Sequence, residues 1–87
     1  MKEINIKLTN DTGLHARPAS IFVQKASKFE SDITLIKDGN DYNGKSIMGI
    51  LSMGGVKDDE ITIKAEGKDE KEAIDALKAL VENDFKS

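Results

Sequence analysis

The residues best suited to chemistry surround the only histidine of this 87-residue chain, His15, in the segment 13–19, which reads GLHARPA. Proline is tolerated only in the first turn of a helix, so Pro18 predicts a helix that begins near Ala16 and leaves His15 at or next to its N-cap. The backbone amides of Ala16 and Arg17 would then be donors without intrahelical acceptors, directed at any group that the imidazole carries.

This arrangement favours a phosphoryl group on the ring. An ordinary imidazole is mostly neutral at neutral pH, so its nitrogen needs little activation as a nucleophile. Charge-assisted hydrogen bonds contribute roughly 1.5–3 kcal/mol each, and the planar guanidinium of Arg17 matches a phosphate. Acid–base catalysis by His15 needs a second orienting group; Asp11 is a candidate whose geometry the sequence leaves open. We predict that His15 and Arg17 carry the chemistry, with the backbone of Ala16 and Arg17 stabilising phosphate.

A second candidate site lies at Ser46, directly before the apolar run 47–53. Serine is a favoured N-cap and contributes about 1 kcal/mol in that role, and Gly54-Gly55 is a suitable helix stop. A phosphate on Ser46 would gain from the helix start and from Lys45. The sequence therefore predicts a cap that also tolerates phosphorylation.

The helix expected over 47–53 is apolar nearly all round, which is typical of a helix that is either deeply buried or exposes one side. We expect Ile50 and Met53 to face the core. The other three apolar residues of this helix are Ile47, Met48 and Leu51. We predict that they dock partner proteins, together with Leu14 beside the histidine. The alternative is that all five apolar residues of the helix belong to the core.

The segment 39–46, GNDYNGKS, fits the P-loop pattern of nucleotide-binding proteins. However, Asp38-Gly39 is better explained as a hairpin turn followed by a short strand around Tyr42. Asp41 would also repel a triphosphate, and the chain lacks the long crossovers that a parallel sheet needs. We keep nucleotide binding as a remote alternative, which calorimetry with ATP or GTP would reject by the absence of binding.

Several elements must position these sites. Alternating apolar residues indicate strands, three- and four-residue spacing indicates helices, and Asp69 with Glu72 resembles a capping box for the last helix. The order is strand, helix, strand, strand, helix, strand, helix. The segments are 3–8, 16–26, a strand that starts with Ile33 and Leu35, the strand around Tyr42, 47–53, 61–65, and a helix that is capped at Asp69 and reaches Val81. Strands with one apolar face predict an α+β fold, in which helices cover one face of an antiparallel sheet.

The composition of the chain excludes several classes of function. The chain has 13 basic and 16 acidic residues, a net charge of −3, and no cysteine. No basic field is present for nucleic acid, no apolar stretch is long enough for membrane insertion, and no thiolate metal site is possible. No signal peptide is visible at Met1. We expect one cytoplasmic domain over 1–87, monomeric, without a metal.

Segment 13–19 resembles the active-site signature of the HPr family, the histidine-containing phosphocarriers of the bacterial sugar phosphotransferase system. Segment 45–49, KSIMG, is similar to the regulatory serine region of Gram-positive-type members, and the resemblance extends over the whole chain. It implies an open-faced sandwich, β-α-β-β-α-β-α, with a four-stranded antiparallel sheet of order 1-4-2-3 covered on one face by three helices. One departure is Gly44, where many members carry a larger residue.

The resemblance also implies a mechanism. His15 would accept phosphate from phospho-enzyme I, through Nδ1, and donate it to sugar-specific IIA components, while Arg17 stabilises the phosphoryl group. Ser46 would be phosphorylated by an HPr kinase/phosphorylase, and the product would recruit a catabolite-control transcription regulator. No cofactor is implied. One histidine and one arginine are too few for a stand-alone phosphotransferase, so the alternatives are a phosphoryl carrier and a purely regulatory adaptor that acts through phospho-Ser46.

Overall fold

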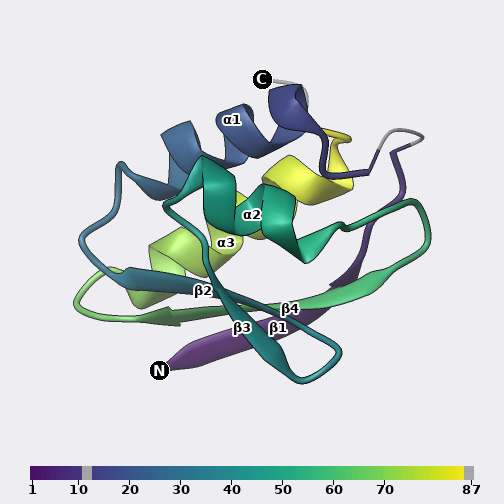
Figure 1. Ribbon diagram of the computed structural model, residues 1–87. Coiled ribbons are helices and arrows are strands. Elements are labelled where there is room, and N and C mark those ends of the chain that lie inside the picture. The colour runs from purple at the N-terminus through teal and green to yellow at the C-terminus, as the bar shows by residue number, and fades with distance from the viewer. Residues whose placement is uncertain (11–12, 86–87) are drawn as a thin grey trace.

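The computed structural model describes residues 1–10 and 13–85. It contains four strands and three helices in the predicted order (Figure 1). Their bounds are β1 Lys2–Lys7, α1 Ala16–Ala26, β2 Asp32–Lys37, β3 Asn40–Asn43, α2 Ile47–Met53, β4 Glu60–Glu66 and α3 Glu70–Glu82.

The four strands form one sheet in which every neighbouring pair is antiparallel, in the order β1-β4-β2-β3. The register aligns Ile4 with Ile63 and Ile63 with Leu35, which places these side chains on the same face of the sheet. This face packs on the helices. The strand order and the alternation expected from the sequence are both confirmed.

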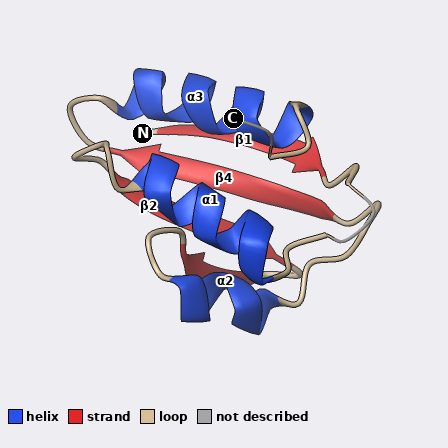
Figure 2. Cartoon of the chain, turned by 90° about the horizontal axis from the view of Figure 1, so that it is seen from above, coloured by secondary structure: helices blue, strands red, loops and turns tan. Residues whose placement is uncertain are grey.

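All three helices lie on one side of the sheet, so the fold has two layers (Figure 2). The buried side chains form a single cluster between the layers, in which Phe22 of α1, Ile50 of α2 and Leu77 of α3 meet the strands. Within the described residues no helix is long and apolar enough to cross a membrane. The open-faced sandwich is thus confirmed.

The turn between β2 and β3 decides against a P-loop. Asp38 and Gly39 have φ angles of 52° and 79°, as a tight two-residue hairpin requires, and Asn40–Asn43 pair with β2 as a strand. The backbone of this segment is therefore used by the sheet and does not wrap around a phosphate. Gly44 follows, and its amide donates to the Ile33 carbonyl at 2.8 Å.

Glycine at position 44 is required by a close approach. A Cβ there would lie 2.5 Å from Cγ2 of Ile33, which is too close for two carbon atoms without movement of the core. Gly44 therefore directly follows the end of β3 at Asn43, and the atoms nearest to its Cβ position all belong to Ile33.

The capping box predicted for α3 is wrong. Asp69 is the N-cap, but its side chain forms no capping bond. It accepts hydrogen bonds from the amides of Glu30 and Ser31, at 2.8 and 2.9 Å, and from the Ser31 hydroxyl. Three donors from the loop before β2 outcompete the start of the helix, so Asp69 ties two loops that are 38 residues apart.

We expect this tie to make stability depend on acid pH. The Ser31 hydroxyl, followed by the Glu30 amide, holds the pKa of Asp69 below its usual value. A lowered pKa in the folded state gives stability that is present above the ordinary aspartate range, near pH 4, and lost as the pH falls through the folded value. Asp69→Asn should therefore be less stable than the wild type at neutral pH and lose less stability on acidification.

Urea unfolding at neutral and acidic pH measures this difference. Asp75→Asn is the matched control, because Asp75 is exposed on α3 and makes the same change of charge outside the tie. If the stability of Asp69→Asn and of Asp75→Asn depends on acid pH as that of the wild type does, the hydrogen bonds of Asp69 are not the cause of the acid dependence.

Candidate functional site

The structure places His15 where Pro18 predicted it. His15 is the N-cap of α1, with extended backbone angles (φ −80°, ψ −175°), and Pro18 occupies the first turn. The carbonyl of His15 accepts the first helical hydrogen bond, from the Ala19 amide at 2.9 Å. His15 therefore lies directly before the first residue of the helix.

The loop that carries His15 is fixed to the loop after α2. Gly13 has a φ of 61°, and a Cβ on it would lie 2.5 Å from the Gly55 carbonyl oxygen and 2.7 Å from Cα of Val56. The next amide, of Leu14, donates to that same carbonyl at 3.0 Å. Only glycine permits both the left-handed angle and the close approach. Gly13 therefore holds the loop before His15 against the loop that follows α2.

The polar groups around His15 are open to solvent. His15, Ala16 and Arg17 are all exposed, and no side chain caps the start of α1. In the part of the chain that the structure describes, no acceptor binds the amides of Ala16 and Arg17. These amides and the positive end of the α1 dipole are available to an anion on His15. Asp11, the candidate orienting group, lies outside the described residues.

Ser46 is the N-cap of α2, as predicted. Its Oγ accepts a hydrogen bond from the Gly49 amide at 3.1 Å, and α2 ends at Gly54 with a φ of 66°. The side chain of Lys45 does not lie free beside Ser46, as the sequence led us to expect. Its ammonium donates to the Phe29 carbonyl at 2.7 Å, so it is engaged across the fold and would have to leave that bond to reach a phosphate on Ser46.

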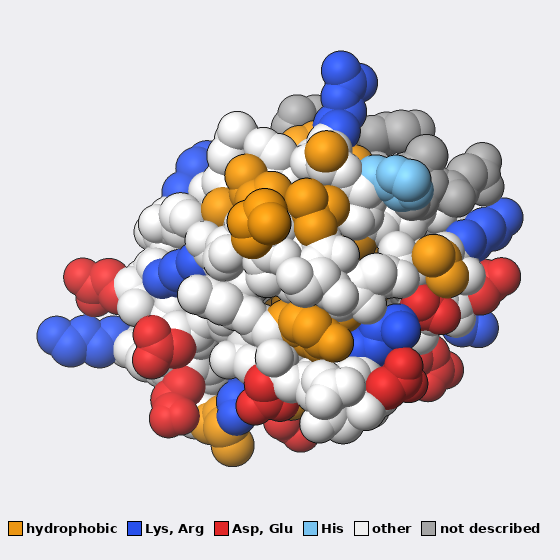
Figure 3. All heavy atoms as spheres, viewed as in Figure 1, with side chains coloured by type: hydrophobic (Ala, Val, Ile, Leu, Met, Phe, Trp, Pro, Cys, Tyr) orange, Lys and Arg blue, Asp and Glu red, His pale blue; other side chains and the backbone are white. Residues whose placement is uncertain are grey.

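The two faces of α2 separate as expected. Ile50 and Met53 are buried, whereas Ile47, Met48 and Leu51 are 40%, 73% and 37% exposed. We call these last three residues the α2 patch. Hydrophobic side chains gather on the same face of the molecule that exposes His15 (Figure 3). The alternative in which all five are core is therefore wrong.

Leu14 does not belong to this surface. Only 4% of it is exposed, and it packs in the core, because the positive φ of Gly13 turns the chain inward just before the helix. The sequence reasoning also missed Val56, which is 55% exposed and whose backbone contacts the Gly13 loop. A single valine between Gly54-Gly55 and the charged segment 57–60 was the available signal.

Comparison with known proteins shows the family of this chain. Residues 2–83 match the family model PTS-HPr, described as the PTS HPr component phosphorylation site. The phosphocarrier protein HPr of Mycoplasma pneumoniae is 47% identical over 94% of each chain. The HPr-like protein Crh of Bacillus subtilis is 44% identical over 97% of this chain and 99% of the relative.

Solved structures agree with these matches. HPr-C-His from Thermoanaerobacter tengcongensis is 54% identical, with a TM-score of 0.95 over 98% of this chain and 96% of the other. An HPr dimer from the same organism is 53% identical, with a TM-score of 0.80 over the whole of both chains, so a monomer is not general among the relatives. From the match over nearly its full length, this chain belongs to the HPr family of phosphocarriers.

Proposed function

We propose that this chain carries phosphoryl groups within a bacterial sugar phosphotransferase system. The Nδ1 atom of His15 takes the phosphoryl group from phospho-enzyme I, and the bond between phosphorus and the donor breaks as the new P–N bond forms. A sugar-specific IIA component then receives the group, and His15 returns to its free state. The chain acts as one cytoplasmic domain, without a cofactor, and its partners supply the rest of the catalytic machinery.

The observation that carries this proposal is the exposed histidine at the start of α1, next to two amides with no acceptor in the described part of the chain. A phosphohistidine brings negative charge to that point. Each amide can donate a charge-assisted hydrogen bond to it, and the helix dipole adds to them. The free imidazole gains little from the same donors, so the site favours the phosphorylated state.

Arg17 contributes a second kind of contact. Its side chain is exposed beside His15, and a guanidinium can donate two parallel hydrogen bonds to a phosphate. We expect Arg17→Gln to slow phosphoryl transfer roughly 10- to 100-fold, which corresponds to the loss of about 1.5–3 kcal/mol. Rapid-quench measurement of transfer from phospho-enzyme I gives this rate.

Arg17→Lys is the matched variant, because it keeps the positive charge and loses the planar fork. We expect its rate to lie between those of Arg17→Gln and the wild type. Wild-type rates in both variants would exclude a role for the guanidinium.

The labelling experiment tests the function as a whole. The protein is mixed with enzyme I and radiolabelled phosphoenolpyruvate, and the label is characterised by its stability. Phosphohistidine predicts a label that acid removes and alkali preserves, and that moves to a IIA component added afterwards. A folded wild-type protein that remains unlabelled under conditions in which a known HPr is labelled would reject the proposal.

A regulatory role through Ser46 is the second candidate, and the similarity to HPr-like protein Crh favours it. The solution structure of one such relative is described as the Bacillus subtilis catabolite repression HPr. In this chain Ser46 is partly exposed and lies directly before Ile47 and Met48 of the α2 patch. Phosphorylation there by an HPr kinase/phosphorylase would add a charge of about −1.5 to −2 beside the patch. Docking of enzyme I would weaken, and a catabolite-control transcription regulator would gain a new anionic contact.

Ser46→Ala separates the structural role of this residue from the regulatory one. We expect the variant to lose about 1 kcal/mol of unfolding free energy, because the Gly49 amide loses its capping acceptor. Labelling by the kinase should vanish in Ser46→Ala and persist in His15→Ala. Kinase labelling of Ser46→Ala at the wild-type level would place the modified residue elsewhere.

A further inference from the structure

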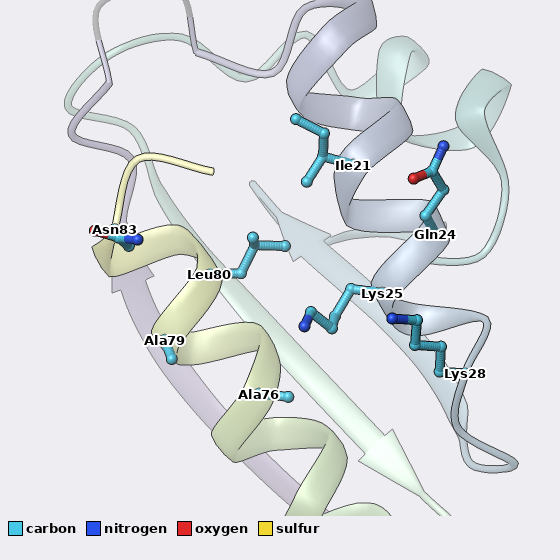
Figure 4. Close-up of a pocket in the computed structure, with 8 residues that line it drawn as sticks. All are labelled: Ile21, Gln24, Lys25, Lys28, Ala76, Ala79, Leu80 and Asn83. Atoms are coloured by element: carbon cyan, nitrogen blue, oxygen red, sulfur yellow. The ribbon is translucent and has the colours of Figure 1, made fainter. Parts of the chain in front are cut away.

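A cleft between α1 and α3 lies apart from the His15 segment and from the α2 patch. Its volume is about 390 Å³, at the lower end of the range of ordinary small-molecule pockets, about 300–1,000 Å³. Its apolar side chains come from both helices, namely Ile21 of α1 and Ala76, Ala79 and Leu80 of α3 (Figure 4). The small alanines leave room between the helices.

Two lysines give this cleft its charge. Lys25 and Lys28 belong to its lining, and no acidic residue among those that the structure describes does, although the chain as a whole has a net charge of −3. Lys25 is only partly exposed, and its side chain extends from α1 into the space between α1 and α3 (Figure 4). Neither ammonium forms a hydrogen bond or an ion pair with any residue that the structure describes.

The position of the lysines has one simple cause. Cations are favoured near the C-terminal end of a helix, and α1 ends at Ala26, between the two lysines. This accounts for lysines at these positions. It does not account for a Lys25 side chain that extends into the cleft (Figure 4), where none of the described lining residues is acidic.

We propose that this cleft binds a small organic monophosphate with an apolar body. A phosphate carries about −1.5 to −2 charges at neutral pH, so it can pair with both ammonium groups, whereas a carboxylate satisfies one. The apolar body lies against Ile21 and Leu80, between the two helices. Few atoms of such a ligand make contact in an open cleft, so we expect affinity in the millimolar range.

Titration of the uniformly ¹⁵N-labelled full chain with phenyl phosphate, at constant ionic strength, tests this binding. We expect saturable shifts of amides along the cleft, centred on Lys25 and Ala79. Inorganic phosphate, which lacks the apolar body, should bind at least several-fold more weakly. Equal affinity for the two ligands, no saturable shift, or shifts centred on His15 would each overturn the proposal.

A pair of double variants tests the part played by the lysines. Lys25→Gln/Lys28→Gln should weaken phenyl phosphate binding several-fold or abolish it. The control, Lys71→Gln/Lys78→Gln, removes the same charge from exposed positions on α3 and should keep most of the wild-type affinity. An equal loss in both double variants would show that only net charge matters and would overturn the assignment of the cleft. The amide spectrum of each variant reports that it is folded.

Discussion

His15→Ala abolishes phosphoryl transfer from phospho-enzyme I and leaves the fold intact; this is the largest effect that we expect from any single substitution. The imidazole is the only nucleophile that we propose for the transfer, and no second histidine is available in the chain. The side chain is exposed, so its removal should change the unfolding free energy by no more than about 0.5 kcal/mol. Labelling and urea unfolding, measured on the same preparation, check both parts.

The separation of activity from stability is what makes this result informative. A variant that unfolds would lose labelling for a trivial reason, and the exposed position of His15 argues against that outcome. Acid-labile label that remains in a folded His15→Ala protein would mean that another residue accepts the phosphoryl group.

The α2 patch gives the second largest effect. Met48 is 73% exposed, and residues that are exposed and apolar beside a reactive group are suited to docking. Methionine also adapts to partners of different shape. We expect Met48→Asp to reduce the rate of transfer from phospho-enzyme I at limiting protein concentration about 10- to 100-fold, the effect of losing one well-packed contact in an interface.

Stopped-flow or rapid-quench kinetics over a range of protein concentration measures this loss. The defect should diminish at high concentration, because Met48→Asp weakens docking and leaves the chemistry at His15 unchanged. Lys64→Gln, on the opposite face of the sheet, is the control, because it makes the net charge more negative by the same one unit as Met48→Asp. The docking role is wrong if Met48→Asp and the corresponding change at Leu51 leave both transfer and fold intact.

Local rules were sufficient for the start of α1 and for the faces of α2. Pro18 restricts where a helix can begin, so the covalent geometry of one residue places His15 at or next to the N-cap, and His15 is the N-cap. In α2, the three-residue spacing of Ile50 and Met53 puts them on one side of the helix, and both are buried. Each of these predictions depends only on residues close together in the sequence.

The predictions that failed depend on contacts between distant segments. Asp69 was assigned to a local capping box, but the donors that bind it come from residues 30 and 31. Leu14 is predicted to dock partners, whereas the packing of Gly13 against Gly55 directs its side chain into the core. Leu14 and His15 are neighbours in sequence, yet Leu14 is buried and His15 is exposed.

Proximity in space is the other property that local patterns leave open. The loop before α1 and the loop after α2 are held together by the bond from the Leu14 amide to the Gly55 carbonyl, between residues 41 positions apart in the sequence. No periodicity encodes that bond. Val56 lies beside the His15 loop because of the same contact between distant segments.

The most direct test of the account compares the ¹H–¹⁵N spectra of the free and the phosphorylated protein. If the amides at the start of α1, which have no acceptor among the described residues, bind the phosphoryl group on His15, the amide protons of Ala16 and Arg17 should move downfield and show the largest changes in the spectrum. Unchanged resonances for these two amides, in a protein that carries phosphate on His15, would contradict the account.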